Sequence, residues 1–384
     1  MLRDRRVLVL AGLVALLPVL YTLYAGSLDL KVYRTGGYAW LHGVSLYSEQ
    51  FADLVPGIRL PFTYPPLAAI LFTYLYAVPF TVAELVMNAA SVAGLTATLL
   101  VVSARLHGWN RRAVVIGLVG ALTAMALEPV RSTIGFGQVN LVLMGLVALD
   151  CLLPRTRWPR GLLIGLAAAI KLTPAVFVIF FLVRRDYRSA IVSAVSFAGF
   201  SLFAWCLAPG DSRDYWFGVL FDPDRIGGAT YAFNQCFQAV LARVMDEGLA
   251  RTVVWLALVA ASGALTWLAA WRRRAAGDDV TALLVVAVWG LLASPVSWSH
   301  HWVWIAPAVL VLLTKRRLLW ATALVFVVGP HTYLPPEGRD WSLLEHVVGS
   351  AYVLVGVALL VWQSLVRQSV VPAQEERKSA ALIR

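Results

Sequence analysis

Apolar runs that approach the length of a bilayer crossing recur from one end of the 384-residue chain to the other. A soluble core needs no such repetition, so the pattern predicts an all-α integral membrane protein with about twelve transmembrane helices. The composition agrees, because 60% of the residues are hydrophobic and only 14% are charged. The predicted runs are residues 7–25, 84–105, 113–127, 139–153, 161–170, 174–183, 189–207, 252–271, 281–295, 302–314, 318–328 and 346–362.

Basic residues gather in groups of three between these runs. In a soluble protein the net charge of +11 would favour nucleic-acid binding, but loop topology explains it better here and no nucleic-acid partner is expected. Basic loops stay inside, which predicts a cell-membrane protein with both termini cytoplasmic. The groups are Arg105, Arg111, Arg112; Arg155, Arg157, Arg160; Arg184, Arg185, Arg188; Arg272, Arg273, Arg274; and Lys315, Arg316, Arg317.

This topology makes residues 1–384 a single membrane domain. Residues 26–83 become a first outer loop with interfacial helices, and residues 367–384 become a cytoplasmic tail. The proline-broken apolar stretch 64–80 is then expected to lie in the outer interface. In an alternative topology this stretch crosses the bilayer and residues 161–183 cross once, but two basic groups then lie outside.

Three positions carry ionisable groups where a membrane protein rarely places them. Asp29 follows the first run and can serve as a general base, although an interfacial ion pair with a nearby cation would also explain it. Lys171 follows ten apolar and small residues at an expected chain break before Pro174, and its ammonium can bind a lipid phosphate. Snorkelling of the lysine to the interface is the structural alternative.

The adjacent His300 and His301 lie in a tryptophan-rich outer segment and can donate to phosphate or sugar oxygens. No metal-binding motif accompanies them, so no metal and no cofactor is predicted. Polar residues of other outer segments are expected on the same face, where they either cap helices or line a cavity. They are Arg131, Gln138, Asn140, Asn234 and Gln235.

Several motifs in the same order resemble the polyprenol-phosphate-mannose-dependent mannosyltransferases of glycosyltransferase family 87, within the GT-C superfamily. Tyr33, Arg34, Tyr64 and Trp298 belong to these motifs and are expected to line the substrate cavity. The matching stretches are DLKVYRTGGYAWLHGVSLY (29–47), LPFTYPPLAAIL (60–71), GFGQVNLVLMGLVAL (135–149), GLAAAIKLTPAVFVIFFLVRRDYR (165–188), FNQC (233–236) and SPVSWSHHWVW (294–304).

The resemblance implies a GT-C-type helical bundle that moves a mannosyl group from a polyprenyl-phosphate donor to a hydroxyl of a glycolipid or glycan outside the cell. Transfer would invert the anomeric centre and form an α-1,2 linkage. Asp29 would be the base, and the donor phosphate would contact Lys171, His300, His301 and Arg131. Two other functions stay open: an arabinofuranosyltransferase with a decaprenyl-phosphate donor, and a transporter or flippase of lipid-linked sugars.

Overall fold

The computed structural model describes residues 4–23, 26–312 and 316–365, and in these residues the regular structure is helical, with two isolated β-bridges. The predicted tail, 367–384, lies outside the described residues. The α-helices are α1 (Arg5–Thr22), α2 (Leu28–Leu41), α3 (Glu49–Asp53), α4 (Pro66–Tyr76), α5 (Phe80–His107), α6 (Arg111–Ala124), α7 (Glu128–Phe136), α8 (Asn140–Leu152), α9 (Leu162–Ile170), α10 (Val178–Val183), α11 (Tyr187–Leu207), α12 (Pro209–Phe217), α13 (Phe237–Val244), α14 (Leu249–Ala275), α15 (Asp279–Ala293), α16 (Ile305–Leu312), α17 (Arg316–Val328), α18 (Leu343–Gly349) and α19 (Ala351–Leu365). The 3₁₀ turns are η1 (Thr173–Phe177), η2 (Val219–Phe221), η3 (Pro223–Ile226), η4 (Ser299–Trp304) and η5 (Pro330–Tyr333).

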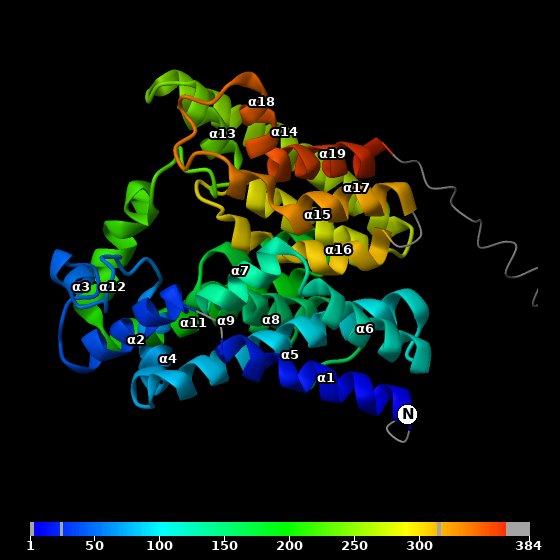
Figure 1. Ribbon diagram of the computed structural model, residues 1–384, viewed down its shortest axis with the longest axis horizontal. Helices are drawn as coiled ribbons and strands as arrows, with labels where there is room; N and C mark the ends of the chain where they lie inside the picture. Colours follow the sequence, from blue (N-terminus) through cyan, green and yellow to red (C-terminus); the bar gives the residue numbers. More distant parts are fainter. Residues whose placement is uncertain (1–3, 24–25, 313–315, 366–384) are drawn as a thin grey trace, which may run out of the picture.

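The helices form two groups stacked on each other (Figure 1). One group contains α1, α4, α5, α6 and α8, the other contains α14, α15, α17 and α19, and α7 and α16 lie between them. The groups meet where α7 packs on the 3₁₀ turn η4. The beginning of α1 and the end of α19 lie at one end of the long axis, and α2, α3 and α12 lie at the other.

Four helices, α1, α5, α11 and α14, are long and apolar enough to cross a bilayer. The pair α6 and α7 bends by 72° and the pair α18 and α19 by 66°, and each pair would add one span if counted as one broken helix. Further apolar segments are only 10–17 residues long: Pro66–Tyr76, Asn140–Leu152, Thr173–Val183, Asp279–Ala293 and Ser299–Leu312. The molecule is thus an all-helical protein with several apolar helices, as a membrane protein requires.

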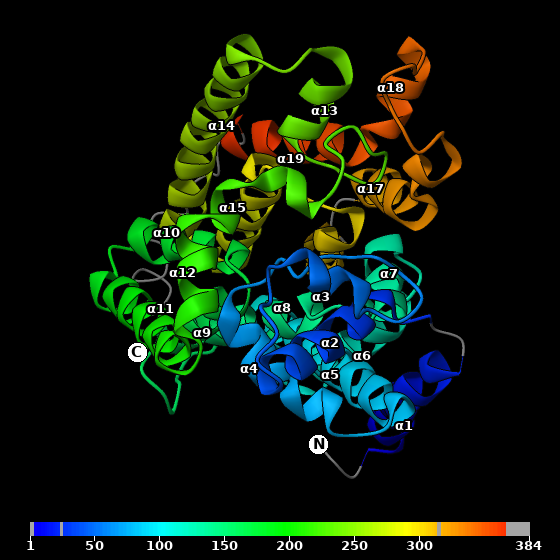
Figure 2. The same cartoon turned by 90° about the vertical axis from the view of Figure 1, so that its left-hand side faces the viewer.

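Two polar segments that are distant in the sequence join at the end of the molecule that carries α2, α3 and α12 (Figure 2). The Leu46 amide donates to Asp211 at 2.9 Å, and the Arg225 guanidinium donates to the Tyr47 carbonyl at 2.7 Å. The expected helical pieces of the first loop are present as α2, α3 and α4. These contacts hold that loop against the segment that follows α11.

The helix predicted to break before Pro174 does so. Helix α9 ends at Ile170, and Lys171 has an extended backbone with φ −147°. Pro174 then lies in the first turn of η1, where its missing N–H costs nothing. Lys171 therefore stands in an interruption of the helix, where its side chain is free to reach a neighbouring element.

Helices α5 and α8 cross at a pair of glycines. A Cβ at Gly94 would lie 2.3 Å from the carbonyl oxygen of Leu141, and a Cβ at Gly145 would lie 2.8 Å from the Gly94 Cα. Small residues let two helix backbones approach this closely. The crossing fixes the first turn of α8, which carries Asn140.

We expect Gly94→Ala to lower the free energy of unfolding by about 1–3 kcal/mol, because the added methyl group must push α8 away. The thermal midpoint of the purified protein in detergent measures this effect. Gly199→Ala is the matched control, since a Cβ at Gly199 in α11 meets no atom within 4 Å. Equal midpoints for the two variants would contradict the close crossing.

Candidate active site

A cavity of about 880 Å³ is lined in part by residues of α2 and α12, which lie at one end of the molecule. It gathers side chains from segments that span most of the sequence, and its polar members include four of the predicted site residues that carry ionisable groups. The lining residues are Leu28, Asp29, Val32, Leu60, Pro61, Thr63, Tyr64, Pro65, Phe136, Gln138, Lys171, Leu172, Thr173, Val176, Tyr215, Val219, Leu220, Ile226, Gly227, Gly228, Tyr231, Phe233, Trp289, Gly290, Ala293, Ser294, Pro295, Val296, Trp298, His300 and His301.

Asp29 is held by a network of neutral polar groups. The Tyr33 and Tyr64 hydroxyl oxygens lie 2.8 and 3.0 Å from Gln138 Oε1, and 2.8 Å from each other. Because the amide oxygen accepts from the tyrosines, the amide nitrogen of Gln138 is left to donate to the Asp29 carboxylate. Tyr33 and Gln138 are buried. Tyr33 and Tyr64 thus hold the Gln138 amide that orients the carboxylate.

The surroundings of Asp29 suit a base. Burial raises the pKa of its carboxyl to about 6, while the hydrogen bond from Gln138 and the charge of Lys171 act in the opposite direction. A carboxylate with a pKa near 6 is a stronger proton acceptor than a solvated one and is still ionised at neutral pH. The half-buried side chain faces the cavity, where a hydroxyl can reach it.

Lys171 contacts neutral partners. Its Nζ donates to Asn140 Oδ1 at 2.9 Å, lies 3.1 Å from His301 Nε2, and sits 5.3 Å from the centroid of the Tyr64 ring. In the described part of the chain no carboxylate oxygen lies within 4.0 Å of this ammonium, so its charge is left for an anion in the cavity. Lys171, His301 and Asn140 therefore form a cationic group from three separate elements.

The backbone of the histidine turn is tied to the first group of helices. The His300 carbonyl accepts from Thr133 Oγ1 at 2.7 Å and from Asn140 Nδ2 at 3.1 Å. The imidazoles of His300 and His301 meet edge to face, with centroids 4.8 Å apart. The Nε2 atom of His300 has no hydrogen-bond partner in the described protein. Both histidines are part of the cavity lining.

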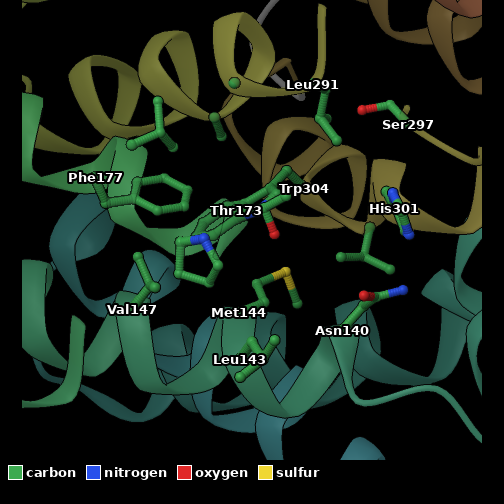
Figure 3. A pocket seen from close by; sticks show the side chains of 15 residues that line it. Asn140, Leu143, Met144, Val147, Thr173, Phe177, Leu291, Ser297, His301 and Trp304 are labelled. Atoms are coloured by element: carbon green, nitrogen blue, oxygen red, sulfur yellow. The ribbon is translucent and has the colours of Figure 1, made fainter. Parts of the chain in front are cut away.

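A smaller apolar recess of about 60 Å³ adjoins the cavity and shares Thr173, Val176, Gly290 and His301 with it. Figure 3 shows Asn140 and His301 at one side of the recess and Phe177 and Val147 at the other. The cationic group thus borders apolar surface. This combination suits a ligand with a charged head and a hydrocarbon chain.

Tyr33, which bonds to Gln138, and Asn140, which lines the recess, are not part of the cavity lining that was predicted for them. Four further predicted site residues do not line the cavity either. Arg34 donates to the carbonyls of Leu75 and Val78, the latter at 2.7 Å, and Arg131 donates to those of Ala126 and Val327, the latter at 3.3 Å. The predicted contact between Arg131 and the donor phosphate is therefore not supported by the position of its side chain.

The other two, Asn234 and Gln235, hold the histidine segment in place. Asn234 Oδ1 accepts from the Ser297 amide at 3.0 Å, and the Gln235 amide donates to the Ser297 carbonyl at 2.7 Å. The Gln235 side chain bonds to the carbonyls of Ala232 and Gly349. Of the remaining predictions, Trp298 lines the cavity, and Asn140 lines the recess and contacts Lys171.

Several residues at the cavity or behind it were not predicted from the sequence. The aromatic residues Tyr215, Tyr231 and Phe233 line the cavity, and Tyr231 and Phe233 stack with centroids 5.4 Å apart. Glu128 lies behind the histidine turn and binds Ser299. Phe233 stands in the FNQC motif, which was a usable signal, whereas Glu128 beside Pro129 looks like an ordinary helix start.

Comparison with known proteins gives the family. Residues 62–295 match the model of glycosyltransferase family 87. A polyprenol-phosphate-mannose-dependent alpha-(1-2)-phosphatidylinositol mannoside mannosyltransferase of Mycolicibacterium smegmatis is 40% identical and aligns over 89% of this chain and 84% of its own. The protein of the same description from Mycobacterium tuberculosis is 41% identical, over 93% and 91%.

A more distant relative is an alpha-(1->3)-arabinofuranosyltransferase of Corynebacterium glutamicum, which is 27% identical over 84% of this chain and 78% of its own. No solved structure matches the chain. The resemblance seen in the sequence motifs is confirmed by the family match and by the two mycobacterial relatives. The chain belongs to glycosyltransferase family 87.

Proposed function

We propose that this protein is a membrane mannosyltransferase that moves mannose from a polyprenyl-phosphate donor to a hydroxyl of a phosphatidylinositol mannoside, with an α-1,2 linkage as product. The donor and the acceptor follow the relatives described above. The observation that carries the mechanism is that Asp29 and the Lys171–His301 pair line one cavity. The cavity thus offers a base and a cationic group to the same bound donor.

The reaction needs one base and a stabilised leaving group. The acceptor oxygen attacks the anomeric carbon as its proton passes to the Asp29 carboxylate. The bond between that carbon and the phosphate oxygen breaks, and its electron pair stays on the polyprenyl phosphate. A β-linked donor gives an α-linked product, because attack comes from the opposite face. No strong general acid is required, in contrast to the two carboxylates of most glycosidases.

The leaving phosphate gains charge as the bond breaks. Lys171 and the imidazoles of His300 and His301 stand where they can stabilise it, and the lysine has no competing carboxylate among its described contacts. The adjoining apolar recess is suited to hydrocarbon next to the phosphate. Tyr231, Phe233 and Trp298 provide flat apolar faces on which sugar rings can pack.

We extend the proposal to the membrane. The start of α1 and the end of α19 share one end of the molecule, opposite α2, α3 and α12 (Figure 1), which supports cytoplasmic termini in the cell membrane and a cavity on the outer side. The short apolar segments would bring the number of crossings to about twelve if the bilayer thins around them. The cavity would then open toward lipid-linked substrates on the outer face.

Incubation of the purified protein with radiolabelled polyprenyl-phosphate-mannose and phosphatidylinositol mannosides tests the function. We expect a labelled glycolipid whose new mannose is released by an α-mannosidase. Polyprenyl-phosphate-arabinofuranose serves as the competing donor. Transfer of arabinofuranose alone would replace the proposed reaction by the arabinosyl alternative, and movement of an intact donor across a vesicle membrane without transfer would indicate a flippase.

We expect Asp29→Asn to lower the rate of transfer by about 10²–10⁴-fold, because the amide cannot accept the acceptor proton. Binding of polyprenyl phosphate should persist. Asp53→Asn is the matched control in the same loop, since Asp53 is exposed and pairs with Arg59 at 3.0 Å. Transfer at the wild-type rate by Asp29→Asn would remove this carboxylate from the mechanism.

The dependence of kcat/KM on pH should reveal the titration of Asp29. The carboxylate must be ionised to accept a proton, so we expect kcat/KM to fall about tenfold per pH unit as the pH drops below the Asp29 pKa of about 6. The hydrogen bond from Gln138 lowers this pKa, so Gln138→Leu should move the acidic limb to higher pH. A limb at an unchanged pH in this variant would contradict the link between Gln138 and Asp29.

A further inference from the structure

We propose that Glu128 is a positioning residue for transfer: it holds the turn that carries His300 and His301 at a fixed distance from Lys171. This inference rests on the proposed role of the imidazoles at the donor phosphate. Glu128 does not line the cavity, so it acts through the turn rather than on the substrate.

The Glu128 carboxylate joins three elements. Its Oε1 accepts from Ser132 Oγ at 2.7 Å within α7 and from Ser299 Oγ at 2.9 Å in η4, and its Oε2 accepts from Tyr352 OH at 2.7 Å in α19. Ser299 directly precedes His300. One carboxylate therefore fixes the first residue of the histidine turn to α7 and to α19.

The burial of Glu128 makes this arrangement costly to break. The residue is 4% exposed, and Ser299 and Tyr352 are fully buried. Within the described ranges no lysine, arginine or histidine nitrogen lies within 4.0 Å of its carboxylate. A buried carboxylate with no cation depends on its hydrogen-bond donors, and bonds to an ionised acceptor are short and directional. The hydroxyls are therefore held in one geometry.

A second set of hydrogen bonds links the histidine turn to the cationic group of Lys171, His301 and Asn140. Thr133, from the same helix as Glu128, and Asn140 both donate to the His300 carbonyl, and Asn140 Oδ1 accepts from Lys171. Lys171 in turn lies 3.1 Å from His301 Nε2. A shift of the turn would alter both the histidine ring and its partner. Misplacement by about 1 Å can cost about 10²-fold in rate.

Asp150 provides a matched control. It is fully buried and its carboxylate accepts three bonds of 3.0 Å, from Trp158 Nε1 and from the amides of Gly161 and Ile164. It lies ten residues after Asn140 in α8, about 15 Å along the helix, and does not line the cavity. Loss of Asp150 should affect folding without acting through the histidine turn.

A double-mutant cycle tests the proposal. Glu128→Gln removes the charge at nearly constant shape, and we expect it to lower kcat/KM for mannosyl transfer about 10–100-fold. We expect His301→Ala to lower kcat/KM as well. The double variant should have the same kcat/KM as His301→Ala alone, because Glu128 acts only by placing the His301 ring. Asp150→Asn should lower the thermal midpoint. Its effect on kcat/KM, expressed as a free energy, should add to that of His301→Ala.

The same variants are also compared by their affinity for polyprenyl phosphate, which native mass spectrometry measures without turnover. This comparison therefore separates the two proposals: a wild-type protein that binds but transfers no sugar contradicts the function, whereas additive losses of binding for Glu128→Gln and His301→Ala overturn the positioning role. Wild-type binding by folded Glu128→Gln also overturns it. If Glu128→Gln does not yield folded protein, Ser299→Ala replaces it, since it deletes only the hydroxyl between the carboxylate and the turn.

Discussion

The contact between α7 and the histidine turn is the constraint on which the rest of the site depends. On one side of α7, the Gly135 carbonyl accepts from the Ser27 amide at 3.0 Å, two residues before Asp29. On the other side, Thr133 holds the His300 carbonyl. A helix of nine residues thus fixes the positions of both the proposed base and the proposed phosphate contacts. Their separation is set by backbone and hydroxyl bonds rather than by flexible side chains, which is what pre-organised transfer requires.

The site also keeps the Asp29 carboxylate and the Lys171 ammonium from forming a direct ion pair. Asp29 is oriented by the Gln138 amide, which two phenols hold, and Lys171 contacts an amide and an imidazole. A direct ion pair between Asp29 and Lys171 would hold the carboxylate ionised with a low pKa and would occupy the ammonium. Neutral partners fix both side chains without neutralising either charge. In the proposed mechanism the Asp29 carboxylate then remains able to accept a proton, and the Lys171 ammonium remains able to bind a phosphate.

The sequence was most informative where an ionisable residue interrupts an apolar pattern. Asp29, Lys171, His300 and His301 line one cavity, as their positions between apolar runs predicted, and neither the interfacial ion pair for Asp29 nor the snorkelling of Lys171 was needed to explain them. For Arg131 the sequence does not separate two roles, because an arginine beside apolar runs looks the same whether it binds a ligand or backbone carbonyls, and its guanidinium donates to two carbonyls. The count of about twelve spans stays a prediction, since hydropathy does not reveal the bends of 72° and 66° within two helix pairs.

The partners of Glu128 are neutral hydroxyls, so they too leave the charge of the cavity unchanged. Among the described residues that line the cavity, Lys171 is the sole lysine or arginine. An arginine beside Glu128 would anchor the turn equally well, but it would bring a second cation close to the imidazoles and compete with Lys171 for the donor phosphate. Three hydroxyls satisfy the carboxylate and add no charge. The scaffold behind the histidine turn can therefore be rigid without changing the electrostatic field in the cavity, as the proposed recognition of the phosphate by Lys171 and its two histidine neighbours requires.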